Sequence, residues 1–387
     1  KKTLFISLLF ICLLPFKKVK AQEPFYTQFF NMPLQLNPST AGLSGLRMNA
    51  AAIYRRQWNP MGGGYNNFSA SVDYATTKNM NFGAIITNDQ IARGALNTSS
   101  LQLIAGYANT IPNIMTFSFA GQFGFFNRKA NFENVTFVDE ILFQNNFARE
   151  FTGTESAFYS NFSAGGMIAT NFGWFGASWH NMAPLFFDGM PIVYTKTSNL
   201  LLEENIDSYG KLSIHGGFEY RFPNVDYFSG FTMLNWRKQG PARQFDILSG
   251  IKFDEQFKNL MVGMGYRSIY WPGDPIELSN RDAMSFFISM DFDINATTFR
   301  LSYSYDLTVS GLSAFSGGAH EGAIVTGTNG FNAQQEKRWE DWVEQHRVIC
   351  PLAYNRGGNM FKFNDRAKKR DKRINFRRLK KKRKSIK

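Results

Sequence analysis

Cysteine is scarce in this sequence, which has only Cys12 and Cys350 among its 387 residues. Cys12 falls in an apolar run from Leu4 to Phe16, which has the length of the hydrophobic part of a secretory signal. Once such a signal is removed, Cys350 is the one cysteine left, so an intramolecular disulfide is excluded. The fold must be stabilised in another way, for example by a closed hydrogen-bonded sheet.

Long hydrophobic runs are also missing. After Gln22 no stretch approaches the roughly 20 consecutive apolar residues that a membrane helix needs, and the mean hydropathy of the chain is -0.27. A β-barrel can still cross a membrane with such a sequence, because its strands alternate lipid-facing apolar residues with polar residues that face the lumen. The 40 Phe, 15 Tyr, 7 Trp and 33 Gly fit a barrel, although two soluble domains would also be compatible with this length.

Residues that carry chemistry are few. The chain has four histidines, and neither His nor Cys recurs at the spacing of metal ligands. Gly62-Gly63-Gly64 is not followed by the Lys and Ser or Thr of a phosphate-binding loop. We therefore predict no catalytic residue, no metal and no cofactor. For His215, on the predicted lumen face, a hydrogen-bond network is favoured over a proton-transfer or ligand site.

The start of the chain is typical of an exported protein. Lys1 and Lys2 precede the apolar run, and Val19-Lys20-Ala21 offers a cleavage site before Gln22. The predicted organisation is a signal peptide over 1–21, a periplasmic N-terminal segment or plug over 22–46, an outer-membrane barrel over 47–327 and a periplasmic basic tail over 328–387.

The segment before the first strand carries Pro33 and the pair Asn37-Pro38. Proline restricts the residue before it, so these positions favour an extended, turned path over a continuous helix. The segment either lines or plugs the lumen, or it is a periplasmic leader that precedes the barrel.

Alternation with a period of two predicts the strands. In residues 114–125, Phe117, Phe119 and Phe123 alternate with Ser118 and Gln122, which gives one lipid-facing and one lumen-facing side. The same pattern is clear at 68–74, 211–222, 283–292 and 297–307, and weaker strands are predicted at 47–57, 80–88, 98–110, 157–170, 172–181, 227–237, 243–253, 258–270 and 319–327. The predicted fold is all-β, a transmembrane antiparallel up-and-down barrel of about 14 strands, with a basic C-terminal extension that is partly helical or disordered.

The predicted connections alternate in length. Short ones at 76–79, 111–113, 171, 223–226, 254–257 and 294–296 alternate with mostly longer ones, notably 128–156, 182–210, 271–282 and 308–318. Outer-membrane barrels pair short periplasmic turns with longer outer loops, so this pattern favours a barrel over a soluble β-sandwich. It also predicts an outer-membrane protein with both termini in the periplasm.

The residues predicted to face the lumen mix both signs of charge. They are Asp73, His215, Glu219, Arg221, Asp246, Lys252, Arg300 and Asp306. Strong selectivity for one sign of ion is therefore not expected. Charge pairing across the interior and a pore for neutral or mixed solutes are the two interpretations.

The net charge of the chain lies at its C-terminal end. Residues 362–387 hold 15 Lys and Arg against Asp365 and Asp371, which accounts for the whole formal net charge of +13. In an exported protein nucleic acid is not the expected partner. The tail either binds acidic periplasmic proteins, peptidoglycan or anionic lipid by salt-sensitive attraction, or is solvated and disordered. The predicted partner-binding residues are Lys368, Lys369, Arg370, Lys372, Arg373, Arg377, Arg378, Lys380, Lys381, Lys382, Arg383 and Lys384.

A possible helix over 334–348 precedes this basic run. It places Trp339, Val343 and, less regularly, Trp342 on one side. The helix either docks on a partner or on the membrane surface, or is short and solvated.

Several motifs resemble the PorP/SprF family. The predicted mature start reads Gln22-Glu23-Pro24-Phe25-Tyr26-Thr27-Gln28-Phe29-Phe30-Asn31 and continues through Pro33 to Gly42. Tyr54-Arg55-Arg56-Gln57-Trp58, Ser302-Tyr303-Ser304-Tyr305-Asp306 and Gly318-Ala319-His320-Glu321 are similar to further family segments. The resemblance covers nearly all of residues 22–327, whereas 328–387 extends beyond the point where many members end.

The resemblance implies a non-enzymatic outer-membrane component of the type IX secretion and gliding-motility machinery of Bacteroidetes. Its expected partners are components of that machinery, a secreted cargo protein that it helps to export or retain at the cell surface, and outer-membrane lipid. The alternatives are a porin or transporter for small solutes and, least favoured because a Ser/His signature is missing, an outer-membrane hydrolase.

Overall fold

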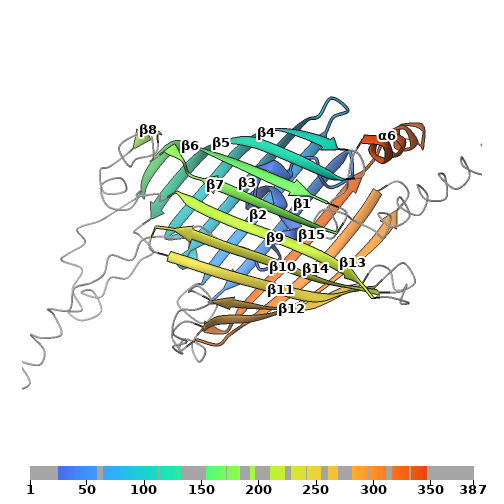
Figure 1. Cartoon of the computed structure of the whole chain (residues 1–387). Helices are drawn as coiled ribbons and strands as arrows, with labels where there is room; N and C mark the ends of the chain where they lie inside the picture. The colour runs from blue at the N-terminus through green and yellow to red at the C-terminus, as the bar shows by residue number, and fades with distance from the viewer. Residues whose placement is uncertain are drawn as a thin grey trace, which may run out of the picture.

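The computed structural model shows a closed antiparallel β-barrel (Figure 1). It describes residues 25–58, 64–111, 114–131, 154–170, 172–183, 192–196, 210–222, 228–240, 242–253, 260–268, 281–294, 297–310, 316–330 and 333–346. The predicted signal peptide, the basic run after residue 362 and Cys350 lie outside the described residues.

The barrel is built from strands that follow one another along the chain. Their bounds are β1 (Met48–Gln57), β2 (Tyr65–Ala75), β3 (Met80–Ile91), β4 (Leu96–Ile111), β5 (Met115–Asn131), β6 (Thr154–Ala169), β7 (Gly173–His180), β8 (Ile192–Lys196), β9 (Lys211–Arg221), β10 (Phe228–Gln239), β11 (Ala242–Phe253), β12 (Met261–Ser268), β13 (Arg281–Ile294), β14 (Thr297–Thr308) and β15 (Ala319–Thr328). Short helical turns are η1 (Phe29–Asn31), α2 (Pro33–Leu36), η2 (Pro38–Thr40) and η3 (Ala92–Gly94), and α6 (Ala333–His346) follows the last strand.

The barrel closes where its first and last strands meet. β1 pairs with β15 in an unbroken register that runs from Met48 opposite Thr328 to Gln57 opposite Ala319. The sheet then continues from strand to neighbouring strand around to the β5–β6 pair. Fourteen of the fifteen described strands form this closed wall, which confirms the predicted fold class.

β8 is the strand that the sequence pattern did not predict. It falls inside the long connection expected at 182–210, and it pairs with residues Ala157 to Ser160 of β6. The pairing of β6 with β7 reaches only as far as Ala164 of β6, opposite Trp179. β8 thus pairs with the part of β6 that extends past the end of β7.

Side chains alternate across the wall as predicted. On β5, Phe119 is 63% exposed on the outer face, whereas its neighbour Ser118 is 1% exposed on the inner face. The exposed large hydrophobic residues of the other strands follow the same alternation. An apolar outer face and a polar interior suit a sheet that is surrounded by lipid.

The two rims of the barrel differ in their connections. The strands are joined at one rim by residues 76–79, 112–114, 170–172, 222–227, 254–260 and 295–296, and we call this the short-connection rim. The other, long-connection rim carries residues 132–153, 181–210, 269–280 and 309–318, together with shorter links at 58–64, 92–95 and 240–241. The predicted difference in length thus holds, with these three shorter links as exceptions.

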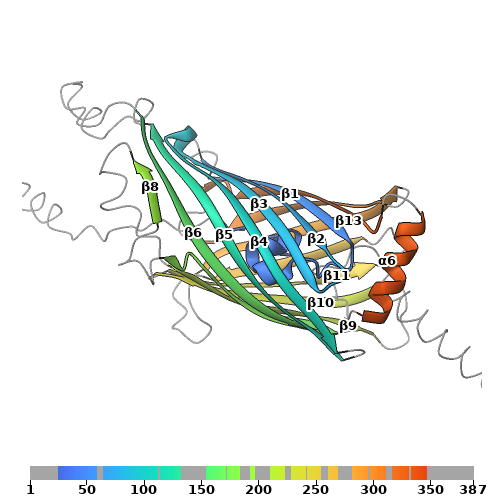
Figure 2. The same ribbon diagram turned by 90° about the horizontal axis from the view of Figure 1, so that it is seen from above.

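α6 lies against the short-connection rim (Figure 2). Trp339 and Val343 are buried against Ala75 at the end of β2, and the Trp339 indole Nε1 donates to the Gly45 carbonyl at 3.1 Å. Trp342 stacks on Trp339 with ring centroids 5.0 Å apart. The helix is therefore docked on the barrel of its own chain. No helix within the described ranges has the length and apolar character to cross a membrane.

Candidate functional site

The interior of the barrel holds the segment that precedes β1. Residues 25–46, here called the N-terminal segment, wind through η1, α2 and η2 inside the ring of strands (Figure 2). Pro33 and Pro38 occupy the first positions of α2 and η2, where a missing N–H costs nothing. The backbone of the segment is thereby folded into short turns, and residues 26–34 and 37–44 are buried.

Apolar residues on the inner wall receive this segment. Phe29, Phe30 and Leu43 pack against wall residues on β4, β6, β7 and β10 to β13, which are Ala108, Met167, Ala169, Trp174, Phe231, Met233, Leu248, Met261 and Phe287. Tyr26 and Met32 pack against β1 and β15, on Ala51, Ile53, Ala323 and Val325. Leu34 and Ala41 pack against Ile85, Ile104 and Ala120. The segment thus contacts the wall on several sides, and its packing removes much apolar surface from water.

Asn37 anchors the middle of the segment to β6, β7 and β9. Its amide Nδ2 lies 3.0 Å from the Gly166 carbonyl and 3.2 Å from the Ala177 carbonyl, and it is 3.1 Å from His215 Nε2. Because the amide donates, Nε2 of His215 is the accepting nitrogen and Nδ1 faces the Ser213 hydroxyl at 3.3 Å. His215 therefore belongs to a buried hydrogen-bond network.

Further polar contacts hold the backbone on either side of Asn37. The Ser178 hydroxyl donates to the Leu36 carbonyl at 2.7 Å, and the Ser118 hydroxyl donates to the Ser39 carbonyl at 2.7 Å. The two strands that flank β6 thus bind the backbone of the segment, which satisfies carbonyl groups that water cannot reach.

A group of buried ionised side chains lies toward the long-connection rim. Arg55 of β1 contacts Asp306 at 2.7 Å and Glu321 at 3.0 Å. Arg267 contacts Asp246 at 2.8 Å and Asp306 at 3.1 Å. We call these five residues the charge cluster. Their side chains are at most 9% exposed, so each charge depends on its partners for the solvation that water would otherwise give.

The backbone of the N-terminal segment completes the charge cluster. The N–H groups of Thr27 and Gln28 donate to the two carboxylate oxygens of Glu321, at 2.9 and 2.7 Å. The Thr27 hydroxyl lies 2.6 Å from an Asp306 oxygen. Two carboxylates on the last strands are therefore bound both by the segment and by Arg55 on the first strand, so the segment ties the closing seam together.

Phe25 covers the cationic side of the cluster. The guanidinium carbons of Arg237 and Arg267 each lie 4.2 Å from the centre of its ring, and that of Arg55 lies 5.4 Å away. Cations over an aromatic face are stabilised by the ring quadrupole, more so where water is excluded. Phe25 thus lies at the level of the long-connection ends of β10 and β12, whereas the segment leaves toward β1 at the opposite rim.

The residues predicted to face the lumen are brought together only in part. Asp246 and Asp306 belong to the charge cluster, His215 contacts Asn37, and Arg300 pairs with Asp291 at 2.6 Å. Asp73 accepts from the Gly42 N–H at 2.8 Å. Lys252 is buried and Glu219 accepts from the Ser229 hydroxyl at 2.6 Å. The side chain of Arg221 lies outside the described residues, as do the twelve basic residues predicted to bind partners.

Sequence reasoning did not assign Arg55, Arg267, Glu321, Thr27 and Gln28 to a site. For Arg55 and Glu321, the strand period indicates that the side chain points inward, and both residues stand in the family motifs quoted above. The apolar residues on lumen-facing positions, such as Phe287 and Ile85, carried a second signal. Such residues in an open polar lumen would be costly, so they mark a surface that another segment covers.

A family model for the type IX secretion system membrane protein PorP/SprF matches residues 18–325. The chain belongs to this family. The resemblance inferred from the opening segment and from the motifs around Arg55, Asp306 and Glu321 is thereby confirmed. Those motifs converge on one place. Arg55, Asp306 and Glu321 of the charge cluster stand in three of them, and Thr27 and Gln28, which donate to the cluster's carboxylates, stand in the opening segment.

Several solved barrels are similar to this family member at low identity. The toluene transporter TodX of Pseudomonas putida is 11% identical, with 78% of this chain and 94% of that chain covered and a TM-score of 0.42. A FadL homologue of Pseudomonas aeruginosa is 9% identical over 76% and 92% of the two chains, with a TM-score of 0.39. The translocator domain of the autotransporter NalP from Neisseria meningitidis is 14% identical over 77% and 94%, with a TM-score of 0.33. No curated protein sequence matches the chain.

We predict that Arg55→Ala destabilises the barrel strongly. The substitution leaves the buried carboxylates of Asp306 and Glu321 short of a cation, which should lower the free energy of unfolding by about 3–5 kcal/mol. Urea unfolding of the purified barrel, followed by its heat-modifiable migration in gels, measures the change. Arg338→Ala on the exposed side of α6 is the control, expected to stay within about 0.5 kcal/mol. Equal stability of the two variants would contradict the role of the charge cluster.

We also predict that Gly165→Ala loosens the N-terminal segment. A Cβ atom at Gly165 would overlap the Asn37 side-chain oxygen, so Asn37 must give up its contacts with β6 and β7. Chymotrypsin should then cleave the folded protein at Phe29 or Phe30 several-fold faster than the wild type. Gly121→Ala is the matched control, because its Cβ meets nothing within 4 Å. Protection as complete as in that control would rule out Asn37 as an anchor.

Proposed function

We propose that this protein is a non-enzymatic component of the type IX secretion machinery that helps to export or retain specific cargo proteins at the cell surface. The observation that carries the proposal is the occupied interior. The N-terminal segment fills the lumen beside the charge cluster and binds inward-facing groups that would otherwise line a pore. We therefore expect the barrel to bind its partners at its rims and outer wall, and not within the lumen.

The long-connection rim is the proposed cargo side. It carries the two longest connections, residues 132–153 and 181–210, next to each other on β5, β6, β7 and β9. Long loops of outer-membrane barrels face the cell exterior, where a surface protein would be met. β6 and β8 extend the sheet on this side.

The short-connection rim is the proposed periplasmic side. The contacts of Trp339 and Val343 hold α6 there, so the chain that follows His346 starts at this rim. The basic run beyond residue 362 is then periplasmic, where it would contact acidic components of the secretion or gliding machinery or peptidoglycan. Phe25, the first described residue, lies toward the long-connection rim, which is the proposed outer side. The periplasmic position of the N-terminus therefore stays a prediction.

An enzymatic role has little support in the arrangement of these groups. Ser213 and His215 are hydrogen-bonded, as a nucleophile and a base would be, but the other imidazole nitrogen faces Asn37 and both residues are buried under the N-terminal segment. A hydrolytic site needs a nucleophile that substrate can reach. No group of His, Cys, Asp and Glu suited to a metal ion occurs among the described residues.

We predict that deleting residues 347–387 leaves the barrel intact and removes most of the cargo from the cell surface. The truncation spares α6 and every described contact, so assembly should be unchanged, whereas the basic partner-binding residues are lost. Surface labelling of the native host measures cargo display, and heat-modifiable migration of the barrel measures assembly. Replacing Lys380, Lys381 and Lys382 by Gln tests the charge alone. Unchanged display after the deletion would place the partner surface on the barrel and its loops.

We further predict that the purified full-length protein gives no steady conductance in planar bilayers. The N-terminal segment blocks the lumen, so openings should be brief and rare, and they should become more frequent in Gly165→Ala. The alternative function as a porin or transporter predicts the opposite, a steady current in the wild type that a permeating solute reduces. Such a current would replace the secretion proposal by that alternative.

A further inference from the structure

The outer face of the closing seam differs from the rest of the wall. On β15, Gly322 faces outward opposite Tyr54 of β1 and Tyr303 of β14. Ala52 of β1 also faces outward, opposite Ile324 of β15. The outer face of the seam thus carries two small residues, Gly322 and Ala52, between the larger side chains of Tyr54, Tyr303 and Ile324.

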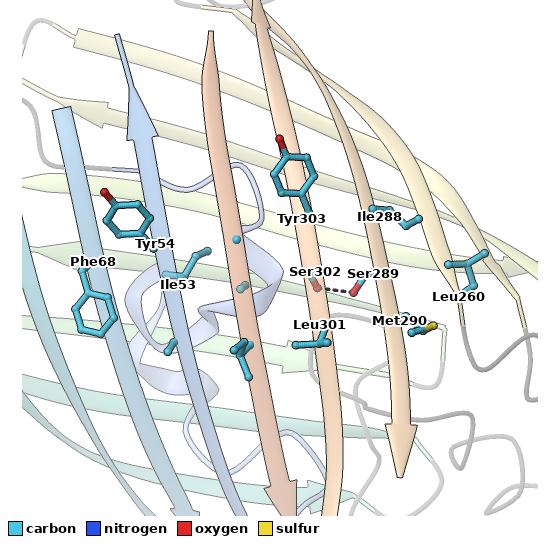
Figure 3. A pocket seen from close by; sticks show the side chains of 14 residues that line it. Ile53, Tyr54, Phe68, Leu260, Ile288, Ser289, Met290, Leu301, Ser302 and Tyr303 are labelled. Atoms are coloured by element: carbon cyan, nitrogen blue, oxygen red, sulfur yellow. Dashed lines mark hydrogen bonds between the residues drawn. The ribbon is translucent and has the colours of Figure 1, made fainter. Parts of the chain in front are cut away.

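These small residues leave a hollow of about 620 Å³ on the outer wall. Figure 3 shows Tyr54 and Phe68 on one side of it, and Tyr303, Leu301, Ile288 and Met290 on the other. These six side chains are 38% to 48% exposed, as is expected on a lipid-facing wall. The lining offers hydrocarbon and aromatic surface.

The size of the hollow matches a hydrocarbon chain. A methylene group is close in size to a water molecule, whose share of liquid volume is about 30 Å³. The hollow thus takes about twenty such groups, which is about the volume of one acyl chain. It lies within the membrane-spanning part of the wall, where acyl chains are the surrounding medium.

Polar groups stand just beyond the hollow, toward the long-connection rim. Arg56 and His320 are direct cross-strand partners on β1 and β15, and both are exposed on the outer face. His320 Nδ1 is 2.7 Å from the Tyr303 hydroxyl, and Tyr54 donates to Asn66 at 3.3 Å. Among the described residues Arg56 has no carboxylate partner, and arginine suits phosphate oxygens well.

We propose that this outer-wall site binds one phosphate-bearing lipid, with an acyl chain in the hollow and its phosphate at Arg56 and His320. The hollow and the polar groups lie on the same two strands. Arg56 and His320 stand two positions closer to the long-connection rim than Tyr54 and Gly322, and their side chains are on the same outer face. The same strands contribute Arg55 and Glu321 to the charge cluster on the inner face. The lipid thus covers the closing seam on the outer face of the barrel, and the N-terminal segment binds the same seam on the inner face.

Native mass spectrometry of the full-length protein, delipidated in detergent and titrated with phosphatidylglycerol, tests the site. Arg56→Ala should weaken lipid binding about tenfold, the loss expected for one charge-assisted hydrogen bond. Gly322→Leu should weaken it as well, because a Cβ at Gly322 meets nothing within 4 Å and the larger side chain enters the hollow.

Matched controls lie on the outer face of β5, away from the seam. Gly121→Leu adds the same side chain at a glycine with an equally open surrounding, and Lys129→Ala removes an exposed cation near the same rim. Both controls should bind phosphatidylglycerol like the wild type. Equal binding by all variants overturns the proposal.

Two other outcomes would also overturn it. If inorganic phosphate displaces the lipid fully and Gly322→Leu has no effect, the site holds a phosphate group without using the hollow. If Gly322→Leu changes the ratio of monomer to dimer and leaves lipid binding unchanged, the seam is an interface between copies of this chain. None of these results bears on cargo display, so the proposed secretion function is tested separately.

Discussion

The ion pair of Arg55 with Asp306 and Glu321 joins the first strand to the last two, and the rest of the interior is arranged around it. Ionised groups removed from water are stable only when every partner is in place. Glu321 has the backbone N–H groups of Thr27 and Gln28 in addition to Arg55. Removing the N-terminal segment would therefore expose a defect at the seam itself. The segment is part of the barrel's structure and not an optional filling.

Alternation along a strand lets one short motif serve two faces of the wall. In the run from Tyr54 to Trp58, Arg55 and Gln57 point inward and are buried, whereas Tyr54 and Arg56 point outward and are exposed. β15 repeats the division with inward Glu321 and outward His320. Each residue of this seam thus serves one of two environments. The inward residues form the buried ion pairs, and the outward residues face the membrane.

The fourteen strands of the wall and their faces could be predicted because a period of two is a local property that each segment shows by itself. The difference between short and long connections followed in the same way. β8 was missed because its five residues pair only with Ala157 to Ser160 of β6, beyond the end of β7, and so short a run has no pattern of its own. The helix after the barrel was predicted, but its docking on Ala75 depends on side chains brought together by the fold.

The charge cluster could not be derived by the same reasoning. Its members stand at positions 55, 246, 267, 306 and 321 and converge only through the closure of the barrel. Local pattern showed that Asp246 and Asp306 face inward, but not which partner each would find. The path of the N-terminal segment was left open between a plug and a leader because proline restricts local geometry without locating a segment. Inward-facing Phe287 and Ile85 were the available signal, since apolar side chains on a lumen face need a cover.

Amide hydrogen exchange over residues 25–44 of the folded, membrane-embedded protein tests the central claim most directly. If the segment is an integral part of the interior, the buried amides of Thr27 and Gln28 should exchange as slowly as those of the neighbouring strands β14 and β15. Exchange at the rate of an exposed loop, in a barrel whose strands remain protected, would show that the segment does not hold the seam.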